Sequence, residues 1–278
     1  MKRRSLQKFC LNLVLILAAL FFIAPFLIMI FGSLKTAGEL AANPGGIPHQ
    51  PTFENYVKLY FYASGRVVRA FLNSIYIAVV HTGLTVVLSA LAAYAFAKYR
   101  FKGSNVLFFC IIGTMMIPIE LTIPPLYIFF SRIHWLNSFA VQMIPGTASA
   151  FGMFLVRQYM TTIPDSLIEA ARIDGAGHLK TFFRVILPVS KPVVGVLALL
   201  TFLTKWNDYL WPLMFVSQPE KQPIMVILPT LNISNSVWSI PWELVLAGCV
   251  VVTLPLVLLF LRYQETFMSS VTVGAVKG

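Results

Sequence analysis

The sequence has few charged side chains and little cysteine. Of its 278 residues, 11% are Asp, Glu, Lys or Arg, whereas a soluble domain carries about 25%. Apolar residues make up 58%, above the roughly 45–50% of soluble domains. This composition excludes an ordinary soluble domain, because the chain cannot cover its surface with polar groups. The cysteines Cys10, Cys110 and Cys249 lie in or beside apolar runs, so a disulfide framework is not expected.

Several enzyme and nucleotide-binding motifs are also missing. The sequence has no G-x-x-x-x-G-K-[ST] loop, so ATP would have to be bound by a partner. It has no H-E-x-x-H, no cysteine–histidine cluster and no G-x-S-x-G. We therefore expect no catalytic residue, metal site or cofactor in this chain. An intramembrane enzyme remains an alternative, and His81 with a nearby serine is its best candidate catalytic pair.

The formal charge of +11 has two readings. A nucleic-acid-binding protein would place a basic stripe with interleaved aromatic residues on a soluble face, and no such stripe is present. Basic residues of a membrane protein gather instead on its cytoplasmic side. We therefore expect this basic chain to lie in a lipid bilayer and not to bind nucleic acid.

Six apolar stretches have the length of a membrane-spanning helix, which takes roughly 20 residues. They are residues 11–31, 72–97, 105–130, 138–156, 192–211 and 244–261. The first stretch is longer than the 7–15-residue apolar core of a signal peptide, so it is expected to stay as the first helix. The sequence predicts an all-α membrane protein with six transmembrane helices.

The direction of the spans follows from the basic residues of alternate loops. Fourteen Lys and Arg residues fall on the side of the termini and seven on the other side, which predicts cytoplasmic termini. Loops 98–104 and 157–191 then face the cytoplasm, and residues 32–71, 131–137 and 212–243 face outward. We divide the chain into residues 1–71, the first helix with its external loop, and a transmembrane core of residues 72–278.

Prolines interrupt three of the stretches. Pro25 and Pro145 are compatible with packed kinks. Glu120 lies between Pro118 and Pro124 in the third stretch, and an ionisable group inside a span usually faces a pathway or a partner. If this helix is shorter than expected, Glu120 lies simply at its water-exposed end.

The loop at 157–191 predicts a short helix. Pro164 suits a first helical position, Asp165 and Glu169 lie near the end that favours anions, and Gly175 and Gly177 suit its stop. A second amphipathic piece covers residues 179–184. Such a helix could dock a cytoplasmic partner or lie on the lipid surface.

The same loop resembles the EAA loop of importer permeases of the ABC (ATP-binding cassette) superfamily. Glu169, Ala170 and Ala171 are followed after three residues by Gly175, and after nine more by Val185, Ile186, Leu187 and Pro188. The family usually has isoleucine at the position of Val185. The resemblance implies a coupling helix held in a cleft of the cytoplasmic ATPase. The residues expected to couple to it are Glu169, Ala170, Ala171, Arg172, Asp174, Gly175, Leu187 and Pro188.

Further segments resemble the maltose-type, carbohydrate-uptake branch of these permeases. They are Ser33-Leu34-Lys35, Asn73-Ser74, Ala93-Tyr94-Ala95, Ile117-Pro118, Trp206-Asn207-Asp208 and the tail Gly274-Ala275-Val276-Lys277-Gly278. The resemblance implies the type I ABC importer permease fold in a bacterial inner membrane. It also implies a second homologous permease, an ATPase dimer that uses ATP and Mg, and an extracytoplasmic solute-binding protein, which the outer segments 40–71 and 217–243 would receive. The solute would be a mono- or oligosaccharide, or a polyol phosphate.

Polar and aromatic residues gather at the end of the fifth stretch. Trp206, Asn207 and Asp208 have the chemistry to contact a sugar or the binding protein, as Glu120 does in the third stretch. Tyr209 and Trp211 fit equally well the aromatic belt of any membrane interface. A secondary transporter driven by an ion gradient is a further alternative, although the chain shows no duplicated half.

Overall fold

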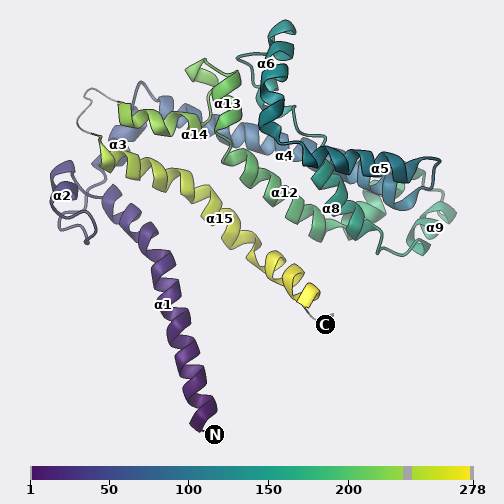
Figure 1. Ribbon diagram of the computed structural model, residues 1–278, viewed down its shortest axis with the longest axis horizontal. Coiled ribbons are helices and arrows are strands. Elements are labelled where there is room, and N and C mark those ends of the chain that lie inside the picture. The colour runs from purple at the N-terminus through teal and green to yellow at the C-terminus, as the bar shows by residue number, and fades with distance from the viewer. Residues whose placement is uncertain (1, 234–239, 276–278) are drawn as a thin grey trace. The chain divides into compact units, whose positions relative to one another are not determined.

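The computed structural model describes residues 2–233 and 240–275, and these are arranged in helices and connecting turns. Residues 234–239, which lie in the expected outer segment 217–243, and tail residues 276–278 are outside the described part. No strand occurs among the described residues. The helices are α1 (Lys2–Ser33), α2 (Ala37–Ala42), α3 (Glu54–Phe61), α4 (Arg66–Lys98), α5 (Ser104–Gly113), α6 (Ile123–Arg132), α7 (Ala140–Met143), α8 (Ala150–Met160), α9 (Ser166–Ile173), α10 (His178–Thr181), α11 (Leu187–Val189), α12 (Lys191–Trp206), α13 (Leu210–Phe215), α14 (Ile224–Ile227) and α15 (Trp242–Ala275) (Figure 1). Shorter helical turns are η1 (Thr114–Met116), η2 (Ile119–Thr122), the π-helical η3 (Phe182–Ile186), η4 (Pro219–Lys221) and η5 (Leu228–Ile233).

Three helices are long and apolar enough to cross a membrane. They contribute the stretches Leu11–Ser33, Arg66–Lys98 and Trp242–Gln264, which overlap the first, second and sixth predicted spans. Two other stretches reach this length only as bent pairs. Ser104–Met116 and Ile119–Arg132 meet at 92°, and His178–Val189 and Lys191–Trp206 meet at 82°. The described residues therefore hold three candidate spans, or five if each bent pair is one span.

The fourth predicted span, residues 138–156, differs from a single helix. It consists of the one-turn helix α7 and of α8, with Pro145 and Gly146 between them. Gly146 has a φ of +83°, a left-handed conformation that glycine adopts without a Cβ clash. Ser149 then starts α8, because its hydroxyl accepts the backbone N–H of Gly152 at 3.0 Å. The proline and glycine thus break this stretch into two helices and do not merely kink one continuous helix.

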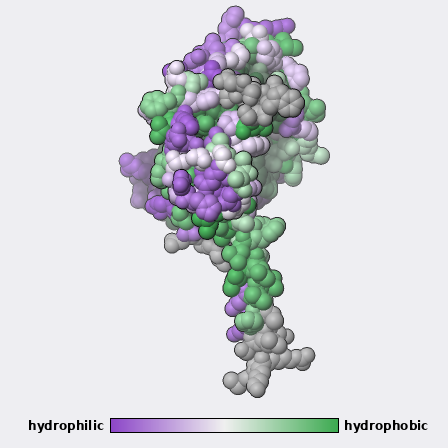
Figure 2. Space-filling view, turned by 90° about the vertical axis from the view of Figure 1, so that its left-hand side faces the viewer, coloured by the Kyte–Doolittle hydropathy of each residue, from purple (hydrophilic) through white to green (hydrophobic). Residues whose placement is uncertain are grey.

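The chain divides into two compact units. The first consists of Met1–Arg69 with Ile227–Pro255, and the second of Ala70–Val226 with Leu256–Gly278. In the first unit, none of the most apolar part of α1 is buried within the chain, and its visible surface is mainly hydrophobic (Figure 2). An apolar helix without intramolecular cover needs lipid or another protein around it.

The turn after α1, also in the first unit, is built around a buried lysine. Lys35 is completely buried, and its ammonium donates to the backbone oxygens of Asn43 at 2.5 Å and Gly46 at 2.6 Å. The side-chain amide of Asn55 donates to the backbone oxygens of Ser33 and Lys35, both at 2.8 Å. These bonds satisfy the buried polar groups and fix the chain after α1.

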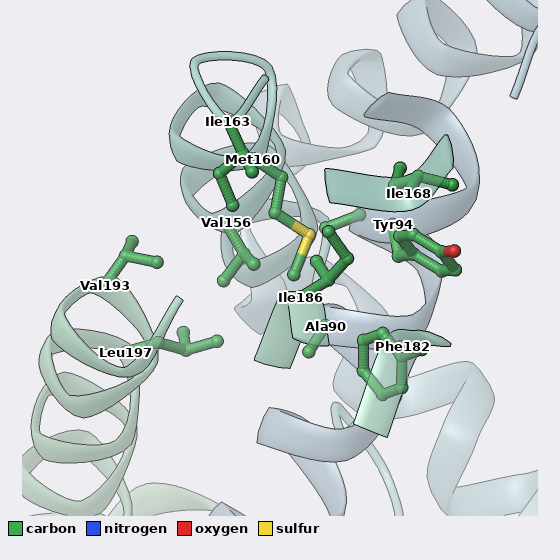
Figure 3. Close-up of a cluster of buried hydrophobic side chains, with 11 residues drawn as sticks. Ala90, Tyr94, Val156, Met160, Ile163, Ile168, Phe182, Ile186, Val193 and Leu197 are labelled. Carbon is green, nitrogen blue, oxygen red and sulfur yellow. The ribbon is translucent and has the colours of Figure 1, made fainter. Parts of the chain in front are cut away.

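The core of the second unit joins α4, α8, α9, η3 and α12 (Figure 3). Its buried members are Ala90, Ala93, Tyr94, Val156, Met160, Ile163, Ile168, Phe182, Ile186, Val193 and Leu197. Gly152 lets α8 approach α4 closely, because a Cβ at this position would lie 2.5 Å from Ser89 Oγ. This core connects the short helix α9 directly to the longest helix of the unit.

Candidate functional site

Helix α9 forms where the sequence predicts a helix in the loop at 157–191. It begins at Ser166, two residues after Pro164, and ends in a left-handed residue, Gly175, with a φ of +72°. The N–H of Ala176 donates to the oxygen of Ala171 at 2.9 Å, and the N–H of Gly175 to that of Arg172 at 3.0 Å. This pair of bonds is a Schellman cap, so Gly175 ends the helix as predicted.

One face of α9 is exposed and the other is buried. Ile168 is buried, and so is Ala171, one of the residues predicted to couple, whereas Ile173 is 87% exposed. Most of the residues predicted to couple are on the exposed surface, namely Glu169, Ala170, Arg172, Asp174 and Gly175. A helix with charged and apolar side chains on its free face suits both alternatives, contact with a partner protein and contact with the lipid surface.

The remaining two predicted residues, Leu187 and Pro188, lie in α11, beyond the π-helical turn η3. Leu187 is half-buried against the core cluster and Pro188 is exposed. Ser190 follows α11, is completely buried, and lies where the chain bends by 82° into α12. The structure therefore separates these two residues from α9 along the chain and places them at the bend that leads to α12.

The α9 segment, residues 165–178, is attached at both ends to the end of α4. At one end, the Lys98 ammonium donates to the Asp165 carboxylate at 2.7 Å and to the backbone oxygen of Ile163 at 2.5 Å. At the other end, the Tyr99 hydroxyl is hydrogen-bonded to His178 Nδ1 at 2.7 Å. Two consecutive residues thus hold both ends of the segment.

The first attachment affects the ionisation of Asp165. Its hydrogen bond with Lys98, and then the charge of this lysine, lower the pKa of the Asp165 carboxyl group below its ordinary value. Arg100 adds a weaker attraction of the same sign. The contact with Lys98 also explains why Asp165 makes no side-chain hydrogen bond to the start of α9.

A cavity of about 640 Å³ lies in the second unit, between α4, the bend from η2 to α6, α8, α12 and α13. This volume is in the range of small-molecule sites, about 300–1,000 Å³. Its polar or ionisable lining residues are His81, Thr85, Glu120, Thr122, Ser149, Thr201, Thr204, Lys205 and Asp208. The structure brings together two of the residues predicted to meet the solute, Glu120 and Asp208.

Lys205, predicted only as one of the basic residues of the outer side, also lines the cavity. Its ammonium lies 2.7 Å from Asp208 Oδ2, and the two side chains are 10% and 22% exposed. Asp208 Oδ1 also accepts the backbone N–H of Trp211 at 3.3 Å. His81, considered above only as an enzyme candidate, lines the same cavity and binds the backbone oxygen of Met143 through Nδ1 at 2.8 Å. The i, i+3 spacing of Lys205 and Asp208 is the signal that could have revealed this pair.

The other two predicted residues support the turn beside the cavity. Trp206 is completely buried, stacks on Phe202 with ring centres 5.8 Å apart, and contacts the edge of Phe71 at 5.6 Å. Asn207 ends α12, and its side-chain amide donates to the backbone oxygen of Leu203 at 2.8 Å. Neither residue is among those that line the cavity.

The described residues contain no group of three or more His, Cys, Asp and Glu side chains that could hold a metal ion. Lys205 already neutralises one of the two cavity carboxylates. The arrangement suits hydrogen bonding to a polar solute in a partly apolar cavity.

Two curated relatives match almost the whole chain. The arabinooligosaccharides transport system permease protein AraQ of Bacillus subtilis (strain 168) is 31% identical over 277 residues, which cover 99% of this chain and 97% of the relative. The sn-glycerol-3-phosphate transport system permease protein UgpE of Yersinia pestis bv. Antiqua (strain Antiqua) is 32% identical over 271 residues, or 96% of each chain.

A solved structure shows the same fold. One chain in the crystal structure of a bacterial ABC transporter, involved in the import of the acidic polysaccharide alginate, matches 95% of this chain and 98% of its own length with a TM-score of 0.84. The identity is 23%, so this likeness concerns the fold. A family described as "Binding-protein-dependent transport system inner membrane component" matches residues 85–272. The chain therefore belongs to this family of inner-membrane transport components and has the all-helical fold of type I ABC permeases.

Proposed function

We propose that this chain is a permease subunit of an ATP-driven importer for a carbohydrate. The observation that carries the proposal is the exposed face of α9, with Glu169, Ala170, Arg172 and Gly175 in the spacing of an EAA loop, in a chain of this transport family. The partners would be a second homologous permease, a cytoplasmic ATPase dimer and an extracytoplasmic solute-binding protein. ATP and Mg would act on the ATPase, and this chain would carry no catalytic residue.

The substrate class rests on the relatives and on the cavity. AraQ is named for arabinooligosaccharides and UgpE for glycerol 3-phosphate, both of which are rich in hydroxyl groups. Hydroxyl groups of a sugar would replace water on Glu120, Asp208 and the neighbouring threonines of the cavity. In this proposal Glu120 and Asp208 face the solute, and Trp206 and Asn207 hold the turn that positions Asp208.

The proposed topology has six spans in the inner membrane. The broken segment formed by α7 and α8 supplies the fourth span, and the α9 segment lies on the cytoplasmic side with both termini. Residues 1–71 form the first helix and its external loop, and residues 72–278 form the permease core with the coupling loop at 157–191. The excess of basic residues on this side supports the orientation.

The proposed mechanism is alternating access. ATP binding closes the ATPase dimer, and the exposed face of α9 moves with it. The core cluster connects α9 to α4, α8 and α12, so a displacement of α9 reaches helices that line the cavity. The cavity then opens alternately to the two sides of the membrane.

The test is co-purification from the native host in mild detergent. We expect an ATPase and a second permease to accompany the wild-type chain and to be lost from Glu169→Lys, because the reversed charge lies on the docking face. Glu220→Lys is the matched control, since Glu220 is an exposed acid in the segment after α13. Recovery of the wild-type chain without an ATPase would refute the importer, and normal uptake by Glu169→Lys would refute the role of α9.

A further inference from the structure

Helix α4 reaches from the α9 segment to the cavity. Lys98 and the adjoining Tyr99 hold the α9 segment, while His81 and Thr85 of the same helix line the cavity. Thr85 precedes Lys98 by 13 residues, which is roughly 20 Å along a helix. Between them, Ala90, Ala93 and Tyr94 are buried in the core cluster, so this stretch of α4 is packed rather than free to bend.

The two attachments differ in chemistry. The Lys98 side chain is 3% exposed, whereas its partner Asp165 is 77% exposed. A buried ammonium requires acceptors, and Lys98 finds them on Asp165, at the start of the α9 segment, and on Ile163, two residues before it. Tyr99 is itself fixed by a hydrogen bond of 2.9 Å to the Tyr94 hydroxyl, and its ring contacts the rings of Tyr94 and His178.

Attachment at both ends determines how the segment can move. A segment held at one end could pivot about that point, and its displacement would then move the connecting loop without moving α4. A segment held at Asp165 by Lys98, the last residue of α4, and at His178 by the next residue, Tyr99, must carry the end of that helix with it. The buried face of α9 adds contacts through Ile168 in the same core.

We propose that α4 is the mechanical link between the ATPase-docking segment and the solute cavity, and that Lys98 and Tyr99 are the positioning residues that attach it. This inference rests on the proposed importer function and assigns the transmission within it to particular side chains. Neither residue touches solute or nucleotide. Their loss should therefore reduce the amount of solute moved per ATP hydrolysed, while the ATPase still binds.

The experiment uses the complete importer reconstituted in liposomes with its native solute-binding protein. Uptake of the carbohydrate that stimulates ATP hydrolysis in the wild-type complex is measured together with phosphate release. We expect Lys98→Met and Tyr99→Phe each to lower the ratio of uptake to hydrolysis about fivefold or more, the lower range of allosteric coupling. Lys98→Arg should preserve the ratio, because it retains both hydrogen bonds.

Matched controls separate positioning from a general loss of structure. Lys102→Met removes an exposed lysine near the same helix end, and Tyr127→Phe removes a tyrosine hydroxyl whose ring packs on Phe215; both should leave the ratio unchanged. If Lys98→Met prevents assembly, Asp165→Asn is the second test, because it removes the charge of the exposed partner and leaves Lys98 its bond to Ile163. An assembled Asp165→Asn complex with an unchanged ratio would contradict the role of the ion pair.

The outcomes distinguish this inference from the importer proposal. A wild-type complex without ATP-driven uptake would refute the importer. A wild-type complex with normal uptake, and Lys98→Met and Tyr99→Phe variants with an unchanged ratio, would refute only the role of α4.

Discussion

Lys205 and Asp208 form an ion pair of 2.7 Å across the turn between α12 and α13, on the wall of the cavity. Both side chains are largely shielded from water. The pair thus joins the last turn of α12 to the turn that follows it. Glu120, the other acidic lining residue, has no ion-pair partner among the described residues.

We predict that Lys205→Met destabilises the protein by about 1–3 kcal/mol, because it leaves the Asp208 carboxylate shielded and uncompensated. The double variant Lys205→Met/Asp208→Asn should recover most of this loss, because it removes both charges. Unfolding of the purified chain in detergent, followed by tryptophan fluorescence, measures both variants. Equal stability of the single variant and the wild type would show that the pair contributes nothing.

A second prediction compares two buried tryptophans. Trp211 Nε1 donates to the backbone oxygen of Val141 at 2.8 Å, whereas Trp206 Nε1 has no hydrogen-bond partner in the described part of the chain. Trp211→Phe should therefore cost about 1–3 kcal/mol more than Trp206→Phe, because it leaves a buried carbonyl unpaired. The same unfolding assay tests this order, with circular dichroism as the signal because both changes remove a fluorophore. The reverse order would contradict the assignment of Trp206 to apolar packing.

A third prediction concerns the close approach of α8 to α4. The Cβ of Gly152→Ala would meet Ser89 Oγ at 2.5 Å and Leu197 Cδ1 at 3.1 Å, so we expect a loss of about 1–3 kcal/mol from overpacking. Adding Ser89→Ala should reduce this loss. Gly195→Ala is the control, because a Cβ in this part of α12 meets no atom within 4 Å. It should be neutral or stabilise the helix by up to about 1 kcal/mol. Equal melting temperatures of Gly152→Ala and Gly195→Ala would refute the prediction.

A fourth prediction follows from the lowered pKa of Asp165. A depressed pKa means that the attachment to Lys98 is present at neutral pH and is lost only as the pH falls below the ordinary value of 3.8. Lys98→Met should raise the titration midpoint of this carboxyl group, and Arg100→Met should raise it less, since Lys98 supplies the largest effects. Carbon-13 NMR of labelled aspartate in detergent micelles measures the midpoints. A larger effect of Arg100→Met would contradict the geometry.

Hydropathy alone predicted the positions of the long helices. The stretches of α1, α4 and α15 that could cross a membrane overlap uninterrupted apolar runs, which leave the backbone no alternative partner in lipid. The end of α9 was also predictable, because Gly175 supplies the left-handed residue of a helix cap.

Sequence alone could not predict how the broken segments bend. Pro118 and Pro145 mark interruptions, but the angle of 92° between Ser104–Met116 and Ile119–Arg132 depends on packing against distant segments. The bent segments contribute to the cavity, so His81, Glu120 and Asp208 could be named as candidates but not placed in one cavity. The contacts of Lys98 with Asp165 and Ile163 were equally inaccessible, since 65 or more residues separate the partners.

The exposed surface of α1 has an evolutionary consequence. The most apolar part of its stretch Leu11–Ser33 is not buried within the chain, and the family match begins only at residue 85. Where lipid surrounds this helix, selection acts on its length and hydrophobicity rather than on side-chain identity, so this part of the sequence should vary freely and be replaceable by an unrelated membrane anchor. The residues whose identity matters lie at the end of the helix and just after it. Ser33 is hydrogen-bonded to the Tyr56 hydroxyl, and the Lys35 ammonium donates to two backbone oxygens. A chimera that replaces α1 should therefore keep the native sequence from Gly32 onward.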